Sequence, residues 1–162
     1  MAEAAQIAVP LIETRNVPRI LPGVVPTTLV HDVSLTIRKG EFVAITGPSG
    51  AGKTQVLKML CGLVWPDQGH VRFLHNELFN SYERIRLTPQ QRQLAYVFQE
   101  YALFPHLTVA QNIGFSLFKN LLNPPKTFVS QEVDRWLETF ELKPLAQQYP
   151  HQLSGGQSQR VA

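Results

Sequence analysis

Several short segments in the first hundred residues have apolar patterns typical of β-strands. Residues 33–37 alternate between apolar and polar and predict a half-buried antiparallel strand. Residues 42–45 are continuously apolar, which predicts a strand buried on both faces. Short strands are predicted at 71–74 and 78–79, around a turn, and a further strand at 94–98.

Proline and glycine separate these strands. Residues 7–16 are extended in character, and the prolines and glycine in 17–26 predict a loop or a hairpin connection. Thr88, Pro89 and Gln91 predict a helix start, with threonine as N-cap and glutamine closing a capping box.

From residue 100 onward the apolar spacing becomes helical. Thr108 is the predicted N-cap of a helix that reaches about Lys119, and Ser130 begins the next helix. That helix carries a stripe at positions i, i+3, i+4 and i+7, which predicts core packing: Val133, Trp136, Leu137 and Phe140. We expect Pro144 to open a short helical turn and Pro150 to end it.

Composition predicts a globular domain, because 44% of the 162 residues are hydrophobic and 17% are charged. The net charge is +3, but the basic residues are scattered, which favours a solvated surface over a nucleic-acid site. The single cysteine, Cys61, permits no disulfide within the chain, and we expect it to be a buried helix thiol in a reducing cytoplasm. The N-terminus lacks the positive start of a signal peptide, and no apolar run has membrane-spanning length.

Residues 47–54, with the sequence GPSGAGKT, carry the strongest chemical signal. They fit the phosphate-loop pattern G-x-x-x-x-G-K-[ST]. A predicted strand precedes them, and an apolar segment with helical spacing, 56–61, follows and stops at Gly62. A chance match is disfavoured, because strand, glycine loop and helix is the arrangement that the motif requires.

The chemistry of this loop suits a triphosphate. Glycines let the backbone come close, so that the amides of 50–54 form an anion nest at a helix N-terminus. Lys53 is expected to reach the β- and γ-phosphates, and the Thr54 hydroxyl to bind Mg²⁺. The candidate nucleotide-binding residues are Gly47, Pro48, Ser49, Gly50, Ala51, Gly52, Lys53 and Thr54.

A second motif, LSGGQ, occupies residues 153–157. Ser154 and two glycines expose backbone amides just before a predicted helix, which again suits an anion. The simpler interpretation is a flexible loop with a serine N-cap, but it is disfavoured downstream of a phosphate loop.

With both motifs in place, the sequence resembles the ATP-binding subunits of ABC transporters over nearly its whole length. The phosphate loop corresponds to their Walker A motif and LSGGQ to their signature motif. Gln99 matches their Q-loop glutamine, and 101–109 is similar to the following stretch in importer subunits that serve polyamine, sulfate, molybdate, iron and sugar uptake.

The resemblance implies a P-loop NTPase of the α/β class, with N-terminal antiparallel β elements and a helical subdomain, incomplete at the C-terminus. It implies β elements and P-loop core over about 1–99, and a helical subdomain over 100–162. Lys53 and Gln99 are the implied catalytic residues, Thr54 and Gln99 would hold Mg²⁺, and the cofactors would be ATP and Mg²⁺. The residues implied to contact the nucleotide of a partner copy are Ser154, Gly155, Gly156 and Gln157.

The implied function is ATP-driven energy coupling in an importer, with transmembrane permease subunits and a second ATP-binding subunit, a homodimer, as partners. No nucleic-acid partner is expected, and the location would be cytoplasmic, on the inner face of the membrane. Two alternatives remain open: a soluble non-transport ABC ATPase of DNA repair or translation, and a nucleotide-binding module without turnover. The short helical segment 100–150, without long coiled-coil arms, favours the transporter.

Residues 101–108 are expected to face a partner, although packing in the core is the alternative, and His106 is expected at the surface.

Two departures from the family pattern matter. No Phe, Tyr or Trp lies between Glu13 and Glu41, so residues 22–26 would pack adenine with aliphatic groups and bind it less tightly. The sequence stops at Ala162, before the family's Walker B strand, catalytic glutamate, D-loop and switch histidine. We therefore expect a fragment that hydrolyses little or no ATP and leaves a sheet edge exposed.

Overall fold

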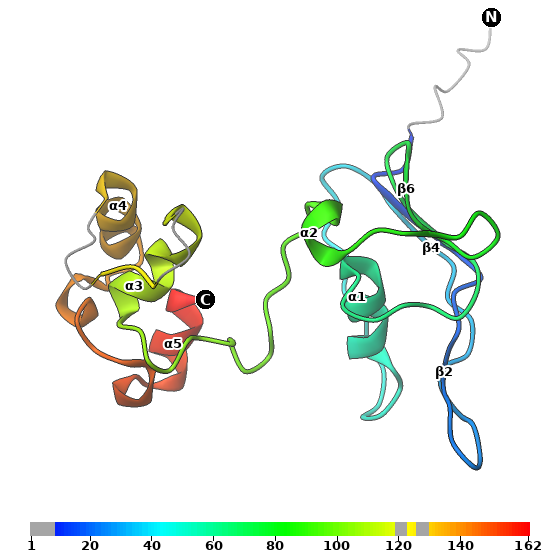
Figure 1. Cartoon of the computed structure of the whole chain (residues 1–162), viewed down its shortest axis with the longest axis horizontal. Coiled ribbons are helices and arrows are strands. Elements are labelled where there is room, and N and C mark those ends of the chain that lie inside the picture. The colour runs from blue at the N-terminus through cyan, green and yellow to red at the C-terminus, as the bar shows by residue number, and fades with distance from the viewer. Residues whose placement is uncertain (1–8, 119–122, 126–129) are drawn as a thin grey trace, which may run out of the picture. The chain divides into compact units, whose positions relative to one another are not determined.

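The computed structural model describes residues 9–118, 123–125 and 130–162 (Figure 1). The chain forms two compact units, Met1–Tyr96 and Val97–Ala162. Each unit has its own buried apolar cluster.

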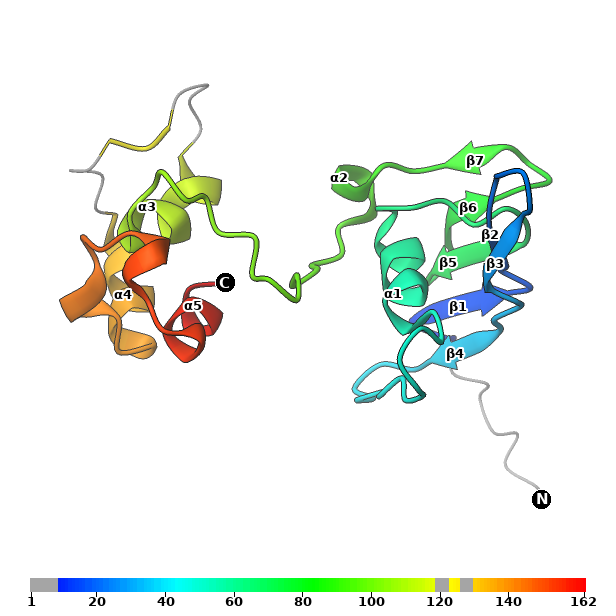
Figure 2. The ribbon, with the colours of Figure 1, turned by 90° about the horizontal axis from the view of Figure 1, so that it is seen from below.

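A five-stranded antiparallel sheet forms the frame of the first unit. Its strands lie side by side in the order β4, β1, β5, β6 and β7 (Figure 2). Their bounds are Leu35–Ile37 for β4, Ile12–Arg15 for β1, His70–Phe73 for β5, Asn76–Asn80 for β6 and Ile85–Arg86 for β7. The strands predicted at 33–37, 71–74 and 78–79 are therefore confirmed, with shifted ends.

The predicted hairpin connection is also confirmed. β2, Arg19–Leu21, pairs antiparallel with β3, Thr27–Val30. Asp67 fixes this hairpin to the loop after the first helix, because its carboxylate accepts a hydrogen bond from the Ile20 amide at 2.6 Å.

Helix α1, Lys53–Cys61, packs against the sheet as its apolar spacing predicts. Val56, Met59 and Leu60 are buried in one cluster with sheet residues such as Val71 and Phe79. The helix ends at Gly62, whose φ of 75° is the left-handed cap conformation. Helix α2, Pro89–Arg92, begins at Thr88, whose amide donates to the Gln91 side chain at 2.9 Å.

The predictions of a buried strand at 42–45 and of a further strand at 94–98 are wrong for this structure. Neither segment forms a strand, and Phe42 is 98% and Val97 67% exposed. A strand buried on both faces needs hydrogen-bonded neighbours on both edges. The ladder from β4 to β7 does not extend to these segments, and no other described strand pairs with them.

Short helices form the second unit, and its capping residues follow the predictions. Their bounds are Val109–Gly114 for α3, Phe115–Leu117 for η1, Gln131–Thr139 for α4, Lys143–Leu145 for η2, Pro150–Gln152 for η3 and Gly155–Val161 for α5. Thr108 is the N-cap of α3, and its Oγ1 accepts a hydrogen bond from the Gln111 amide. Ser130 is the N-cap of α4, and its Oγ accepts a hydrogen bond from the Val133 amide.

Two helix ends differ from the predictions. The helix expected to reach Lys119 instead continues from Gly114 as a 3₁₀ turn, and Lys119 lies outside the described residues. Pro150 begins a 3₁₀ helix, where the sequence predicted that it would end one.

Only half of the predicted stripe on α4 lies in the core. Val133 and Leu137 are buried, but Trp136 and Phe140 are each 41% exposed and stack on each other with centroids 5.8 Å apart. The prediction of core packing is wrong for this pair, because the core formed with α3 and α5 reaches only the 133–137 side of the helix. No described helix combines the length and apolar character that crossing a bilayer requires.

Candidate functional site

The phosphate loop lies at the N-terminus of α1 and is held open by its glycines. Gly47, Gly50 and Gly52 have φ values of 149°, 81° and 82°, which side chains rarely adopt. Residues 47–51 are exposed, and the Ala51 amide donates to the Pro48 carbonyl at 3.3 Å. The sequence prediction of a glycine-dependent backbone therefore holds in the geometry.

Gly52 is the tightest point of the loop. A Cβ atom there would lie 2.4 Å from the carbonyl oxygen of Leu29 and 3.0 Å from Cγ2 of Val30. Both neighbours belong to β3, so the hairpin strand presses directly on the start of α1. Gly52 also accepts the first helical hydrogen bond, from the Val56 amide at 3.0 Å.

Lys53 bends back over the loop. Its Nζ donates hydrogen bonds to the carbonyl oxygens of Gly47 at 2.8 Å and Pro48 at 2.7 Å. The first turn of α1 contains no acidic residue, and Thr54 is exposed beside Lys53. A cation, backbone donors and the positive end of a helix thus meet without a carboxylate, which fits an anionic phosphate chain.

A cavity of about 310 Å³ adjoins this loop. Lys53 and Thr54 form its polar edge, and the rest of its lining is apolar: Leu35, Ile37, Val43, Ile45, Leu57 and Leu60. Val43 and Ile45 belong to the segment predicted as a buried strand. Their side chains line a hollow beside α1 instead of a closed core.

The hairpin loop at 22–26 is aliphatic and open. Val24 is fully exposed and Val25 is 78% exposed. Both residues lie between β2 and β3, and β3 in turn contacts Gly52.

The second motif forms a capped helix start. Ser154 is the N-cap of α5: its Oγ accepts a hydrogen bond from the Gln157 amide at 3.3 Å, and its own amide donates to Gln157 Oε1 at 2.8 Å. A Cβ atom at Gly155 or Gly156 would meet no atom within 4 Å. Packing among the described residues of the second unit therefore does not require the two glycines, and their backbone is exposed.

Gln99 lies in an exposed turn of the second unit. The four signature residues belong to the same unit, at the start of α5. The phosphate loop belongs to the first unit. The structure thus brings together the predicted residues of each motif within its own unit.

Residues 101–108 divide between surface and core. Phe104, Pro105 and His106 are exposed, whereas Leu107 and Thr108 are buried. Phe104 contacts Phe115 with ring centroids 4.3 Å apart. The exposed part of the segment is therefore a small aromatic surface.

Two side chains with several main-chain hydrogen bonds were not predicted from the sequence: Asn112 in the second unit and Arg92 in the first. Asn112 accepts a hydrogen bond from the Phe104 amide at 2.8 Å and donates to the carbonyls of Phe104, Leu107 and Thr108. The one sequence signal for Asn112 was an asparagine inside a short helix, where it is disfavoured unless its side chain has partners.

Arg92 is buried beside α1, and burial lowers its pKa to about 10, so it remains charged at neutral pH.

Known proteins with similar sequences are ATP-binding proteins of import or transport systems. Residues 30–162 match the family model described as ABC transporter. The spermidine/putrescine import ATP-binding protein PotA of Chromobacterium violaceum is 41% identical over 152 residues, covering 94% of this chain and 39% of that protein. The putrescine transport ATP-binding protein PotG of Escherichia coli K12 is 40% identical over 161 residues, covering 99% of this chain and 40% of that protein. The chain thus spans about two fifths of the length of these relatives.

A sulfate/thiosulfate import protein and two solved structures are also similar to this chain. The sulfate/thiosulfate import ATP-binding protein CysA 1 of Agrobacterium fabrum is 44% identical over 135 residues, covering 82% of this chain and 37% of that protein. The dimeric structure of MJ0796, a bacterial ABC transporter cassette, is 31% identical with a TM-score of 0.72. MJ0796 in a post-hydrolysis state, bound to ADP and Pi, is 29% identical with the same TM-score. Each structural match covers 93% of this chain and 66% of the other chain.

Proposed function

Because this chain belongs to the ABC transporter family, we propose that it supplies the phosphate-binding and signature segments of an importer's ATP-binding subunit. The observation that carries the proposal is the phosphate loop, where Lys53 and the left-handed glycines converge on the N-terminus of α1. The curated relatives described above are ATP-binding proteins of import or transport systems.

Within the loop, the backbone amides and Lys53 bind the triphosphate. Lys53 leaves the carbonyls of Gly47 and Pro48 and turns to the phosphate oxygens, which are the stronger acceptors because they are charged. The Thr54 hydroxyl would hold Mg²⁺, and Gln99 is the other residue expected to serve the metal. Mg²⁺ bound by these residues would neutralise charge that develops during phosphoryl transfer.

The signature residues act on a nucleotide held by a second copy of the chain. Gly155 and Gly156 have open space around them, and the capping box at Ser154 already fixes the helix start. Such a preformed end of a helix presents amides to a phosphate without rearrangement. MJ0796, a structural relative, forms dimers.

The exposed aromatic residue Phe104, with its neighbours Pro105 and His106, is the surface that meets a permease subunit. Asn112 on α3 makes hydrogen bonds to the amide and the carbonyl of Phe104 in this turn. Through such partners the protein sits on the cytoplasmic face of the membrane. No nucleic acid takes part.

In this proposal a full-length member of the family is an ATP hydrolase, whereas residues 1–162 bind nucleotide with little turnover. The loop contributes a cation and backbone donors, but it contains no carboxylate to hold the metal or a water. A soluble ABC ATPase of DNA repair or translation fits less well, because the relatives described above are import or transport proteins. Aliphatic residues at 22–26 would hold adenine weakly, so the phosphates provide most of the affinity.

Equilibrium titration of the purified chain with a fluorescent ATP analogue tests the proposal. We expect saturable binding in Mg²⁺ that unlabelled ATP displaces, with phosphate release at background level. A chain that is folded by circular dichroism but binds no nucleotide would contradict it.

A further inference from the structure

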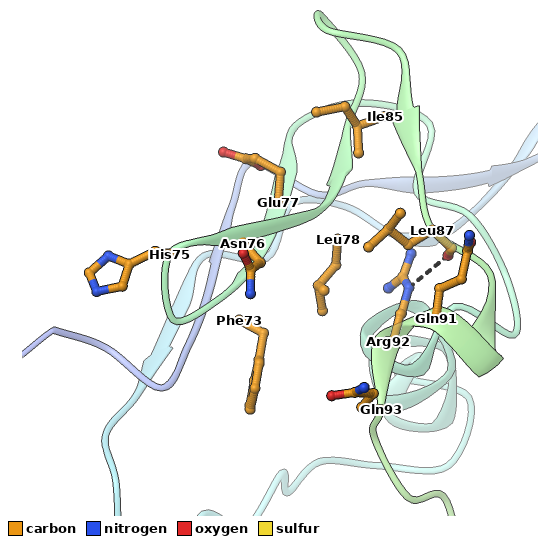
Figure 3. A pocket seen from close by; sticks show the side chains of 10 residues that line it. All are labelled: Phe73, His75, Asn76, Glu77, Leu78, Ile85, Leu87, Gln91, Arg92 and Gln93. Carbon is orange, nitrogen blue, oxygen red and sulfur yellow. Dashed lines mark hydrogen bonds between the residues drawn. The ribbon is translucent and has the colours of Figure 1, made fainter.

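Arg92, the last residue of α2, is 1% exposed, and its guanidinium group donates hydrogen bonds to three main-chain carbonyls. Its Nε donates to the carbonyl of Leu87 at 3.0 Å (Figure 3). Its Nη1 donates to the carbonyls of Met59 at 2.8 Å and Leu60 at 2.7 Å. No carboxylate pairs with Arg92 in the part of the chain that the structure describes.

Met59 and Leu60 lie in the last turn of α1, the helix whose first residue is Lys53. Carbonyls at a helix C-terminus lack partners within the helix and carry partial negative charge, so a buried guanidinium suits them. A nine-residue helix moves as a short rod, about 13 Å long. The phosphate loop and Arg92 therefore hold opposite ends of one rigid element.

The fit around the guanidinium is close. A Cβ atom at Gly62 would lie 2.5 Å from Nε of Arg92, so the helix must end in glycine for the side chain to pass. The ring of Trp65 lies 5.2 Å from the guanidinium carbon. Nη2 has no hydrogen-bond acceptor among the described residues, and the ring provides a face for the cation instead.

Beyond Arg92 the first unit continues without regular secondary structure, and Leu94 still packs against its core cluster. Gln93 follows with φ of 55°, and residues 94–96 form neither helix nor strand. A cavity of about 380 Å³ lies beside Arg92 and is lined in part by Leu78, Leu87 and Gln93 (Figure 3). None of its lining residues belongs to α1.

We infer that Arg92 is a positioning residue that carries the state of the phosphate loop along α1 to residues 93–96. When Lys53 turns from the Gly47 and Pro48 carbonyls to a phosphate, the first turn of α1 rearranges. The rod transmits that displacement to Met59 and Leu60, and Arg92 moves with their carbonyls. This inference rests on the proposed function, because the displacement requires a nucleotide at the loop.

Hydrogen exchange measured by mass spectrometry, with and without Mg²⁺ and ATP, tests the inference. In the native chain, nucleotide should slow exchange at the phosphate loop and also change it in peptides that cover 93–96. Arg92→Met removes the donors and the charge at similar volume. We expect this variant to bind the fluorescent nucleotide with less than a tenfold weaker affinity and to keep loop protection. The response at 93–96 should disappear.

Arg86→Met is the matched control, because Arg86 is an exposed arginine of β7. In this control, nucleotide should still slow exchange at the phosphate loop and still change exchange at 93–96. If Arg92→Met is too unstable to purify, Arg92→Lys replaces it: lysine keeps the charge but cannot span three carbonyls, so it should lose at least half of the response.

Two results would overturn the inference while leaving the proposed function standing. One is an Arg92 variant in which nucleotide changes hydrogen exchange at 93–96 as much as it does in the native chain. The other is a native chain in which nucleotide slows exchange at the phosphate loop but leaves exchange at 93–96 unchanged. A native chain that binds no nucleotide overturns both.

Discussion

The ammonium group of Lys53 donates a hydrogen bond to the carbonyl oxygen of Gly47, 2.8 Å away at the other end of the phosphate loop. The first and seventh residues of the motif are thereby joined across the space that the loop encloses. The Pro48 carbonyl accepts a second bond from the same group. The two carbonyls hold the cation where an anion is expected, so phosphate binding exchanges neutral acceptors for charged ones.

Replacing Lys53 with alanine should abolish nucleotide binding and leave the fold intact. The side chain is the one cation within residues 47–54, and its hydrogen bonds in the free chain reach only loop carbonyls. Titration with a fluorescent ATP analogue measures the loss, which we expect to exceed a hundredfold. Lys58→Ala, on the same helix but outside the loop, is the control and should bind as the native chain does. Native affinity in Lys53→Ala would reject the loop as the nucleotide site.

Alanine at two glycines of the loop should lower the stability of the fold by different amounts. Gly50 and Gly52 have nearly the same φ, 81° and 82°, so alanine at either adds about 1–2 kcal/mol of backbone strain. Only at Gly52 would the new Cβ atom lie 2.4 Å from the Leu29 carbonyl, and main chain cannot move aside cheaply. Urea unfolding should show Gly52→Ala to be the less stable variant by at least about 1 kcal/mol. Equal stabilities would mean that β3 does not press on the loop.

Gly155→Asp should leave the fold unchanged and abolish nucleotide-dependent pairing of chains. The position is exposed, nothing lies within 4 Å of its Cβ site, and an acid in the first turn of α5 suits the helix dipole. The same charge repels the γ-phosphate of a nucleotide held by a second copy. Sedimentation with a non-hydrolysable ATP analogue measures the pairing, and Gln159→Glu supplies the control charge farther along α5. An undiminished dimer in Gly155→Asp would refute the proposed role in trans.

Cys61 should react slowly with alkylating reagents in the native chain. Burial raises the pKa of its thiol, although the charge of Arg92 opposes that shift. Because the thiolate is the nucleophile, the native chain at pH 8 should be alkylated more slowly than the urea-unfolded chain, and its rate should rise at higher pH. In Arg92→Met the opposing charge is lost, so the native profile should move to still higher pH. A native rate equal to the unfolded rate would show that the thiol is not shielded.

Local chemistry explains what the sequence determined. The glycines of the phosphate loop, the Gly62 stop and the caps at Thr108 and Ser154 act on amides within a few residues, so their spacing along the chain carries the geometry. The hairpin between β2 and β3 follows from proline and glycine in the same way. These short-range features also make up most of the candidate site.

Contacts between distant segments decided the rest. Residues 42–45 are apolar enough for a buried strand, but a strand needs neighbours that no local pattern supplies. Trp136 and Leu137 are both apolar, yet only the packing of α4 decides which of them reaches the core. Arg92 resembled any other surface arginine until folding placed it 2.8 Å from a carbonyl 33 residues earlier in the chain. Burial and long-range hydrogen bonds depend on which segments meet in space, and periodicity along one segment contains no record of that.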